Sequence, residues 1–390
     1  MRVLYVNQTA AVSGAERSLL DIVNGLGDAV DPVVACPPGE LAEAVKAIGV
    51  RHEPIVGTQA SFRFHPLHTS RGLAEIGRSA GEVRRLAAET GADLVHANTT
   101  RAALLAILRR RKTPPILAHV RDWTPDGFAP RRVNGVLTRG ADLVVTNSQY
   151  VAGQFEGLKA RRPVRALYDP VDISGFDPNA DPAPVRREFA IGRETVVLAV
   201  VAQLTPWKAQ DDAIRALAAL PTGGPDTALL LAGSAVFSGE GTKFDNQAYV
   251  DGLHRLASEL GVADRVHFLG ERADVPAVLA ATDIVLLPSW REAYGRIAVE
   301  GLAMGVPVVA TEVGGPAEIV RPGVDGLLLP PKSPDLWARE LGPLVDSASQ
   351  RAEMGANGVE RAQNFSVPTQ MRELLAVYAE LTGKSPGAAL

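Results

Sequence analysis

Short β-branched and aliphatic runs alternate with stretches of helical spacing along this 390-residue chain. Parallel strands need long crossover connections, so this alternation predicts an α/β fold with helices on both faces of a parallel sheet. In the first half, Ser18–Leu26 and Leu41–Ile48 have helical spacing. The strand patterns of that half are Val3–Val6, Pro32–Ala35, Leu94–Ala97, Ile116–His119 and Leu143–Asn147.

The chain changes character between Tyr168 and Pro184, where aspartate and proline cluster without periodicity. We expect an interdomain linker there, because a chain of this length can form two domains with separate cores. The valine-rich run Val196–Val201 then predicts the first strand of a second parallel sheet. We therefore expect two doubly wound, Rossmann-like domains, residues 1–172 and 173–365.

Composition excludes several classes of protein. A hydrophobic content of 46% is a globular value, and a net charge of −4 gives no overall attraction to nucleic acid. The single cysteine, Cys36, excludes an internal disulfide and fits a reducing cytoplasm. The start of the sequence has no signal-peptide pattern and no apolar run is long enough to span a bilayer, so we expect a soluble, cytoplasmic protein. The basic run Arg109–Lys112 predicts a solvated helix end, with peripheral membrane contact as the alternative.

The stretch from Asp283 to Ile319 combines strands, glycine turns and two spaced carboxylates. Ile284–Leu287 predicts a buried parallel strand, Glu292 follows its end, and Glu300 falls in the next helix. Helix N-termini favour phosphate, whereas carboxylates accept hydrogen bonds from hydroxyl groups. Together these features predict a site for a sugar that carries phosphate. Two solvated glutamates beside a helix start are the alternative.

This stretch resembles the Glu-(seven residues)-Glu signature of family 4 retaining glycosyltransferases, which have the two-domain GT-B fold. The resemblance implies that Glu292 contacts the donor sugar near its reacting carbon and that Glu300 holds the ribose. It implies that domain 1–172 binds the acceptor, that domain 173–365 binds a nucleotide sugar across a cleft, and that a helix within 366–383 crosses back to the first domain. The loop residues that it places at the donor are Ala293, Tyr294, Gly295, Arg296 and Ile297.

Three further segments extend the resemblance. Ser13-Gly14-Ala15-Glu16 is similar to the family's Gly-Gly-Ala-Glu loop, which places Gly14 at the donor diphosphate, with a plain helix cap as the alternative. His119 ends a predicted strand where the family has a histidine near an outer hydroxyl group of the donor sugar, and a structural histidine is the alternative. Val266–Gly270 resembles the segment whose backbone binds the donor base, which makes Gly270 a donor-binding candidate.

Lys208 follows the predicted strand Val196–Val201 and offers a positive charge to a pyrophosphate leaving group. The family usually has Gly-Arg at this strand end and lysine five residues later, whereas here Ala202-Gln203 precedes the matching Lys208. Gln203 can bind phosphate but cannot neutralise it, so either Lys208 carries the charge alone or an arginine such as Arg291 or Arg296 compensates. Weaker catalysis is a further alternative. The sequence contains no Asp-x-Asp, and we expect neither a metal ion nor another cofactor.

The polar and aromatic segment Gly57–Arg71 has no clear period, which predicts a loop. We expect this loop to help bind the acceptor, together with the residues that follow His119, and an ordinary surface loop is the alternative. The acceptor-site candidates are Phe62, Arg63, Phe64, His65, His68, Arg121 and Asp122.

The sequence thus predicts a retaining glycosyltransferase with Glu292, His119 and Lys208 as catalytic residues. It would move a sugar from a nucleotide-sugar donor, UDP-linked, to an acceptor hydroxyl group by metal-independent front-side attack. The acceptor could be a saccharide, a lipid-linked glycan or a small metabolite, in glycan or glycosylated natural-product biosynthesis. The alternatives are another GT-B sugar-nucleotide enzyme, such as an epimerase or a phosphorylase, and a weakly active or non-catalytic sugar-nucleotide-binding homologue.

Overall fold

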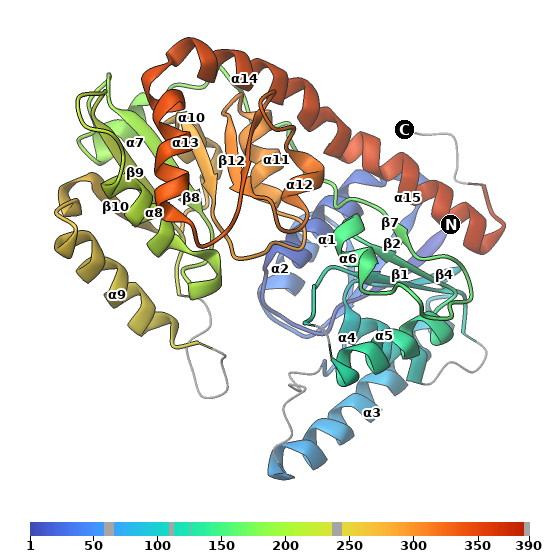
Figure 1. Ribbon diagram of the computed structural model, residues 1–390. Coiled ribbons are helices and arrows are strands. Elements are labelled where there is room, and N and C mark those ends of the chain that lie inside the picture. The colour runs from blue at the N-terminus through green and yellow to red at the C-terminus, as the bar shows by residue number, and fades with distance from the viewer. Residues whose placement is uncertain (58–65, 109–112, 126, 236–243, 386–390) are drawn as a thin grey trace. The chain divides into compact units, whose positions relative to one another are not determined.

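The chain forms two compact units, which are Met1–Val171 with Phe365–Leu390, and Asp172–Asn364 (Figure 1). The structure is a computed structural model that describes residues 1–57, 66–108, 113–125, 127–235 and 244–385. Each unit contains one sheet, and the strand pairings described in both sheets are parallel. The doubly wound α/β architecture predicted from the sequence is therefore confirmed.

The sheet of the first unit has the strand order β3-β2-β1-β4-β5-β6-β7 within the described residues. Strand order reverses between β1 and β4, and in open α/β sheets ligands bind beyond the carboxyl ends of the strands at such a switch point. The strands are β1 Arg2–Val6, β2 Asp31–Cys36, β3 Arg51–Pro54, β4 Leu94–Ala97, β5 Ile116–Val120, β6 Leu143–Thr146 and β7 Arg165–Ala166. The helices are α1 Gly14–Gly25, α2 Glu40–Ala47, α3 Pro66–Glu89, α4 Thr100–Leu108, α5 Phe128–Gly140, α6 Gln149–Gly153 and α15 Val367–Thr382, with a 3-10 turn η1 at Gly27–Ala29.

The sheet of the second unit has the described order β10-β9-β8-β11-β12-β13, with its switch point between β8 and β11. Its strands are β8 Val196–Val201, β9 Thr227–Ala232, β10 Val266–Gly270, β11 Ile284–Leu287, β12 Val308–Thr311 and β13 Gly326–Leu329. Its helices are α7 Ala183–Glu188, α8 Gln210–Ala218, α9 Asn246–Glu259, α10 Val275–Ala280, α11 Arg296–Ala303, α12 Pro316–Ile319, α13 Pro334–Asp346 and α14 Ala348–Ala362. Short 3-10 turns are η2 Pro206–Lys208, η3 Ala263–Arg265 and η4 Gln363–Phe365, the last at the boundary between the units.

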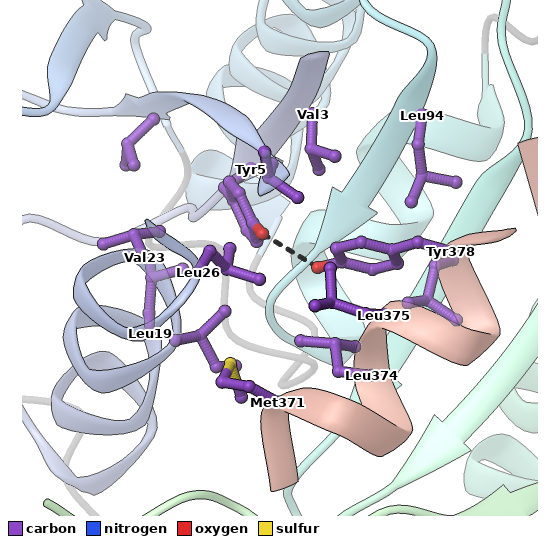
Figure 2. Close-up of a cluster of buried hydrophobic side chains, with 14 of the residues drawn as sticks. Val3, Tyr5, Leu19, Val23, Leu26, Leu94, Met371, Leu374, Leu375 and Tyr378 are labelled. Carbon is purple, nitrogen blue, oxygen red and sulfur yellow. Dashed lines mark hydrogen bonds between the residues drawn. The ribbon is translucent and has the colours of Figure 1, made fainter. Parts of the chain in front are cut away.

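The last helix, α15, completes the core of the first unit. Its apolar side chains Met371, Leu374 and Leu375 pack with Leu19 and Val23 of α1 in one buried cluster (Figure 2). A Cβ added to Gly25 would lie 2.3 Å from Val367 Cγ1, so glycine at the end of α1 allows the close approach of α15. The core of the first unit is thus built from both ends of the described chain.

The prediction of a loop from Gly57 to Arg71 is wrong from Pro66 onward, because α3 begins there and continues to Glu89. Proline is favoured at the first position of a helix, which fits a helix start at Pro66. Residues 66–71 contain no apolar repeat of helical spacing, so the sequence pattern did not reveal this start. Residues 58–65 and 109–112 lie outside the described part of the chain. None of the helices in the described ranges is long and apolar enough to cross a bilayer.

Candidate functional site

Lys208 and Glu292 meet at the switch point of the second unit. Lys208 ends the turn η2 after β8, and Glu292 follows β11, the strand beside β8. Lys208 Nζ lies 2.5 Å from Glu292 Oε2, and the two side chains are only 14% and 11% exposed. Ser289 Oγ donates a second hydrogen bond to the same carboxylate oxygen at 3.1 Å. The two loops are tied together, because the backbone N–H of Trp290 donates to the Trp207 carbonyl oxygen at 2.9 Å.

A pair of glycines fixes the backbone of the Glu292 loop. The Gly315 N–H donates to the Glu292 carbonyl oxygen at 2.9 Å, and Glu292 N–H donates to Val313 at 3.1 Å. Gly314 has φ +113°, and a Cβ added to it would lie 1.8 Å from the Glu292 carbonyl oxygen. Only glycine fits this close approach, so the Gly314-Gly315 turn fixes the position of the backbone at Glu292.

The loop then turns into α11 at Gly295, whose φ of +91° is in the left-handed region. The first-turn N–H groups of α11 point toward its N-terminus and favour an anion or a hydroxyl oxygen. Pro316, the first residue of the four-residue α12, lies beside this start, since a Cβ on Gly295 would be 3.2 Å from Pro316 Cγ. The predicted donor residues Ala293, Tyr294, Gly295, Arg296 and Ile297 therefore occupy one turn and the start of α11.

Of the remaining donor candidates of the second unit, Glu300 lies within α11, and Gln203 and Gly270 lie at strand ends. Glu300 is one helical turn from Arg296, with Oε1 3.6 Å from Arg296 Nε, so this arginine is engaged with its own helix. Gln203 follows β8, and its carbonyl oxygen accepts a hydrogen bond from Gln210 at 2.9 Å. Gly270 ends β10, and its carbonyl oxygen accepts from the Gly233 N–H at 2.7 Å.

Gly14 opens α1 at the switch point of the first unit. A Cβ added to it would meet no atom within 4 Å, so the chain's own packing does not require glycine there. Ser13 caps the helix in reciprocal contact with Glu16, whose Oε2 accepts from the Ser13 N–H at 3.1 Å and from Ser13 Oγ at 2.5 Å. Glu16 is buried and also accepts from Asn7 at 3.2 Å. Glu16 thus supports the start of α1, and the open space at Gly14 leaves room for a ligand.

His119 and Arg121 lie at the end of β5, almost fully buried. The Arg121 guanidinium donates to Asp169 Oδ1 at 2.6 Å, to Asn98 Oδ1 at 2.5 Å and to His119 Nδ1 at 2.9 Å. Burial and the Arg121 charge hold the pKa of His119 well below the usual histidine range, so its imidazole is neutral. Arg121 is thus held in place by its neighbours, whereas Asp122 is exposed and its carbonyl oxygen accepts a hydrogen bond from Gln154 at 3.0 Å.

Sequence reasoning missed His96, Asp169 and Tyr378. Tyr378 Oη lies 2.6 Å from His96 Nδ1, and His96 Nε2 lies 3.2 Å from His119 Nδ1. The alternation of side chains in strands could have identified His96, because polar residues two positions apart lie at the ends of three neighbouring strands on one face. These pairs are Tyr5 and Asn7 at β1, His96 and Asn98 at β4, and His119 and Arg121 at β5. No local signal marks Tyr378, which reaches this face from the last helix.

The acceptor candidates Phe62, Arg63, Phe64 and His65 lie outside the described residues, and His68 falls in α3. Among the residues that are described, no group of three or more His, Cys, Asp or Glu side chains could hold a metal ion. A hollow of about 630 Å³ in the second unit is lined by residues before β8, β9 and β10, including Thr195, Asp226 and Asp264. It lies at the amino edge of the sheet, the opposite edge from Lys208 and Glu292, and parallel α/β sheets do not bind ligands there.

Comparison with known proteins identifies the family of this chain. Residues 12–174 match the family model Glycosyltransferase Family 4, and residues 184–361 match Glycosyl transferases group 1. The D-inositol 3-phosphate glycosyltransferase of Actinosynnema mirum is 31% identical over an alignment of 402 positions, which covers 97% of this chain and 91% of that protein. The chain belongs to glycosyltransferase family 4. The family predicted from the Glu292–Glu300 stretch is thereby confirmed.

A second relative, the D-inositol 3-phosphate glycosyltransferase of Salinispora tropica, is 36% identical over 253 residues, which cover 62% of this chain and 51% of that protein. Like this match, most of those to the first curated relatives span only about half of the relative's length. Among solved structures, Anabaena HepE in complex with UDP-glucose superposes with a TM-score of 0.82 at 28% identity, covering 98% of this chain and all of HepE. WaaG, at 20% identity and a TM-score of 0.69 over 98% of this chain and 100% of its own, shows the shared fold alone. The predicted GT-B class of two Rossmann-like units is confirmed.

Proposed function

We propose that the chain is a retaining glycosyltransferase that moves a sugar from a UDP-linked donor to an acceptor hydroxyl group without a metal ion. The observation that carries this proposal is the buried Lys208–Glu292 pair at the switch point of the second sheet. Membership of family 4 and the UDP-glucose bound by HepE support the choice of donor. Because the relatives from Actinosynnema and Salinispora are named for D-inositol 3-phosphate, that compound is the first acceptor to test.

In the proposed reaction the bond between the sugar C1 and the diphosphate oxygen breaks while the acceptor oxygen attacks from the same face. The acceptor proton passes to the departing phosphate oxygen, so the leaving group acts as the base. The Lys208 ammonium has three N–H donors, and Glu292 takes one at 2.5 Å, which leaves the group oriented with further donors for the diphosphate. Removing this single charge should lower kcat about 10²- to 10³-fold, the usual effect of losing one preorganised donor.

Binding is tested first by thermal shift with UDP-, GDP-, ADP- and dTDP-sugars. A ligand at 100 times its Kd stabilises the folded state by about 2.7 kcal/mol, which gives a clear shift of the midpoint. We expect UDP-sugars alone to stabilise the wild type, and Glu300→Ala to remove the shift. Glu312→Ala is the matched control, because Glu312 is an exposed carboxylate in the loop between β12 and α12. Absence of stabilisation by any UDP-sugar would contradict the proposed donor.

Turnover is tested with the stabilising donor, D-inositol 3-phosphate and a panel of saccharides, lipid-linked glycans and small metabolites. We expect transfer to persist in EDTA and the product's anomeric proton coupling to match that of the donor. Product of the opposite anomeric configuration would refute retention, and loss of activity in EDTA that Mg²⁺ restores would refute metal independence. Donor turnover without any acceptor would favour an epimerase.

Gln203 favours one second candidate, a weakly active or non-catalytic sugar-nucleotide-binding homologue. A neutral amide replaces the family's arginine there, and Arg296 is engaged with Glu300 at 3.6 Å. Gln203→Arg discriminates between the two candidates. A large gain in turnover would show that the native chain is weak, whereas unchanged turnover would show that the site has compensated for the missing charge.

A further inference from the structure

A continuous chain of polar side chains runs through the core of the first unit from β1 to the end of β5. Tyr5 Oη lies 2.9 Å from Tyr378 Oη, and Tyr378 Oη lies 2.6 Å from His96 Nδ1 (Figure 2 shows the first of these contacts). His96 Nε2 lies 3.2 Å from His119 Nδ1. Each of the four side chains is no more than 1% exposed, so bulk water does not supply partners to this chain.

Arg121 determines which atom donates in each of these hydrogen bonds. A guanidinium only donates hydrogen bonds, and Arg121 donates to His119 Nδ1 at 2.9 Å, so this nitrogen carries no proton. The proton of the neutral His119 ring is therefore on Nε2. His96 Nε2 must then be the donor toward His119 Nδ1, which leaves His96 Nδ1 to accept from the Tyr378 hydroxyl group. Tyr5 in turn donates to the Tyr378 oxygen.

This series of hydrogen-bonded side chains ends in one N–H donor that has no partner among the described residues. His119 Nε2 is buried and makes no hydrogen bond to any described residue, and its nearest acidic oxygen, Asp169 Oδ1, is 3.7 Å away, beyond hydrogen-bonding distance. Burial also lowers the pKa of His96 well below the usual histidine range, so both rings stay neutral at physiological pH. An unsatisfied buried N–H is costly unless a ligand oxygen accepts from it.

We infer that Tyr378 and His96 are positioning residues, which hold His119 in its Nε2–H tautomer so that this N–H is available to an oxygen atom of a bound substrate. The part of this inference that concerns the substrate rests on the proposed function. Tyr378 belongs to the last helix, α15, and lies 282 residues from His96 in sequence. Helix α15 therefore acts on the site indirectly, by setting the tautomers of His96 and His119. Asp169 and Asn98 hold the Arg121 group that sets the direction.

Tyr378→Phe tests the positioning role, with Tyr5→Phe as its matched control. Both variants delete one hydroxyl group from the same buried chain, but only Tyr378→Phe removes the donor to His96 Nδ1. We expect Tyr378→Phe to lower kcat on the order of ten-fold, as the loss of an orienting partner does, with the Kd for UDP unchanged. Tyr5→Phe should lower the melting temperature to a similar degree and keep the wild-type kcat. Equal kcat values for the two variants would overturn the inference.

NMR of the 15N-histidine-labelled chain reads the tautomers directly and needs no substrate, so it separates failure of this inference from failure of the proposed donor. We expect His96 and His119 to be neutral Nε2–H tautomers in the wild type and in Tyr5→Phe, with signals assigned through His96→Asn and His119→Asn. In Tyr378→Phe, we expect the Nδ1–H form to become populated at His96 and the His119 signals to shift. A wild-type Nδ1–H tautomer at His119, or His119 signals that Tyr378→Phe leaves unmoved, would refute the chain's direction or its coupling.

Discussion

Replacing Lys208 by methionine should leave the Glu292 carboxylate in a largely enclosed position without its cation. The side chain of Glu292 is 11% exposed, and the Ser289 hydroxyl group is then its remaining side-chain partner at 3.1 Å. Breaking a buried ion pair costs about 3–5 kcal/mol, and the residual exposure of both ends places Lys208→Met near the lower value. At about 2–4 °C per kcal/mol, we expect the melting temperature to fall by about 6–12 °C.

Glu292→Gln should cost less, about 1 kcal/mol, because the lysine stem can carry the ammonium toward water. Lys208 Nζ also lies 4.2 Å above the Trp207 ring, a cation–π contact that survives this substitution. The double variant Lys208→Met/Glu292→Gln leaves no unpaired charge, so it should be more stable than Lys208→Met alone by about 1–2 kcal/mol.

Thermal and urea unfolding of the wild type, the two single variants and the double variant are followed by circular dichroism. The four unfolding free energies form a double-mutant cycle. The expected coupling energy is about 2–3 kcal/mol in favour of the native pair. If the loss in the double variant equals the sum of the single losses within about 0.5 kcal/mol, the pair is not coupled and the reasoning from its geometry fails.

Three further predictions concern single features of the fold. Gly314 has φ +113°, and a Cβ there would lie 1.8 Å from the Glu292 carbonyl oxygen, so Gly314→Ala should destabilise the chain by more than about 2 kcal/mol and abolish the UDP-sugar thermal shift. Gly323→Ala, at φ +76° in open space, should cost only about 1 kcal/mol. Equal losses of unfolding free energy in the two variants would contradict the predicted clash. Burial raises the pKa of the Cys36 thiol to about 12, so iodoacetamide should label it at pH 8 only after unfolding in urea, and rapid labelling of the native chain would contradict this. His96 and His119 stay neutral when folded but gain protons when unfolded below about pH 6.5, so the free energy of unfolding should fall with decreasing pH by up to about 2.7 kcal/mol per pH unit. Urea midpoints that are equal at pH 5 and pH 7 would refute this.

Much of the fold could be predicted because strands buried on both faces leave continuous apolar runs. Ile284–Leu287 and Leu94–Ala97 were predicted with the same bounds that the structure gives to β11 and β4. The edge strand β3 was missed because its residues Arg51–Pro54 are partly exposed and polar, which leaves no apolar run. The start of α3 at Pro66 was missed because residues 66–71 contain no apolar repeat of helical spacing.

Within the candidate site, the sequence predicted the residues that follow strand ends but not the contacts between them. Lys208 and Glu292 were singled out for separate roles, and their pairing across 84 residues depends on the order of β8 and β11 in the sheet. Strand order cannot be read from local periodicity. The same limit hid Tyr378, which has the spacing of an ordinary core residue of an amphipathic helix.

The return of α15 to the first unit has a consequence for how the chain is made. During synthesis, Asp172–Asn364 is made as one continuous segment and can fold before α15 exists, whereas the first unit cannot complete its core until residues 367–382 have been made. Until then Leu19 and Val23 of α1 lack the apolar side chains of α15 that cover them in the folded unit. The first unit is therefore the later of the two to complete its core, although its synthesis starts earlier.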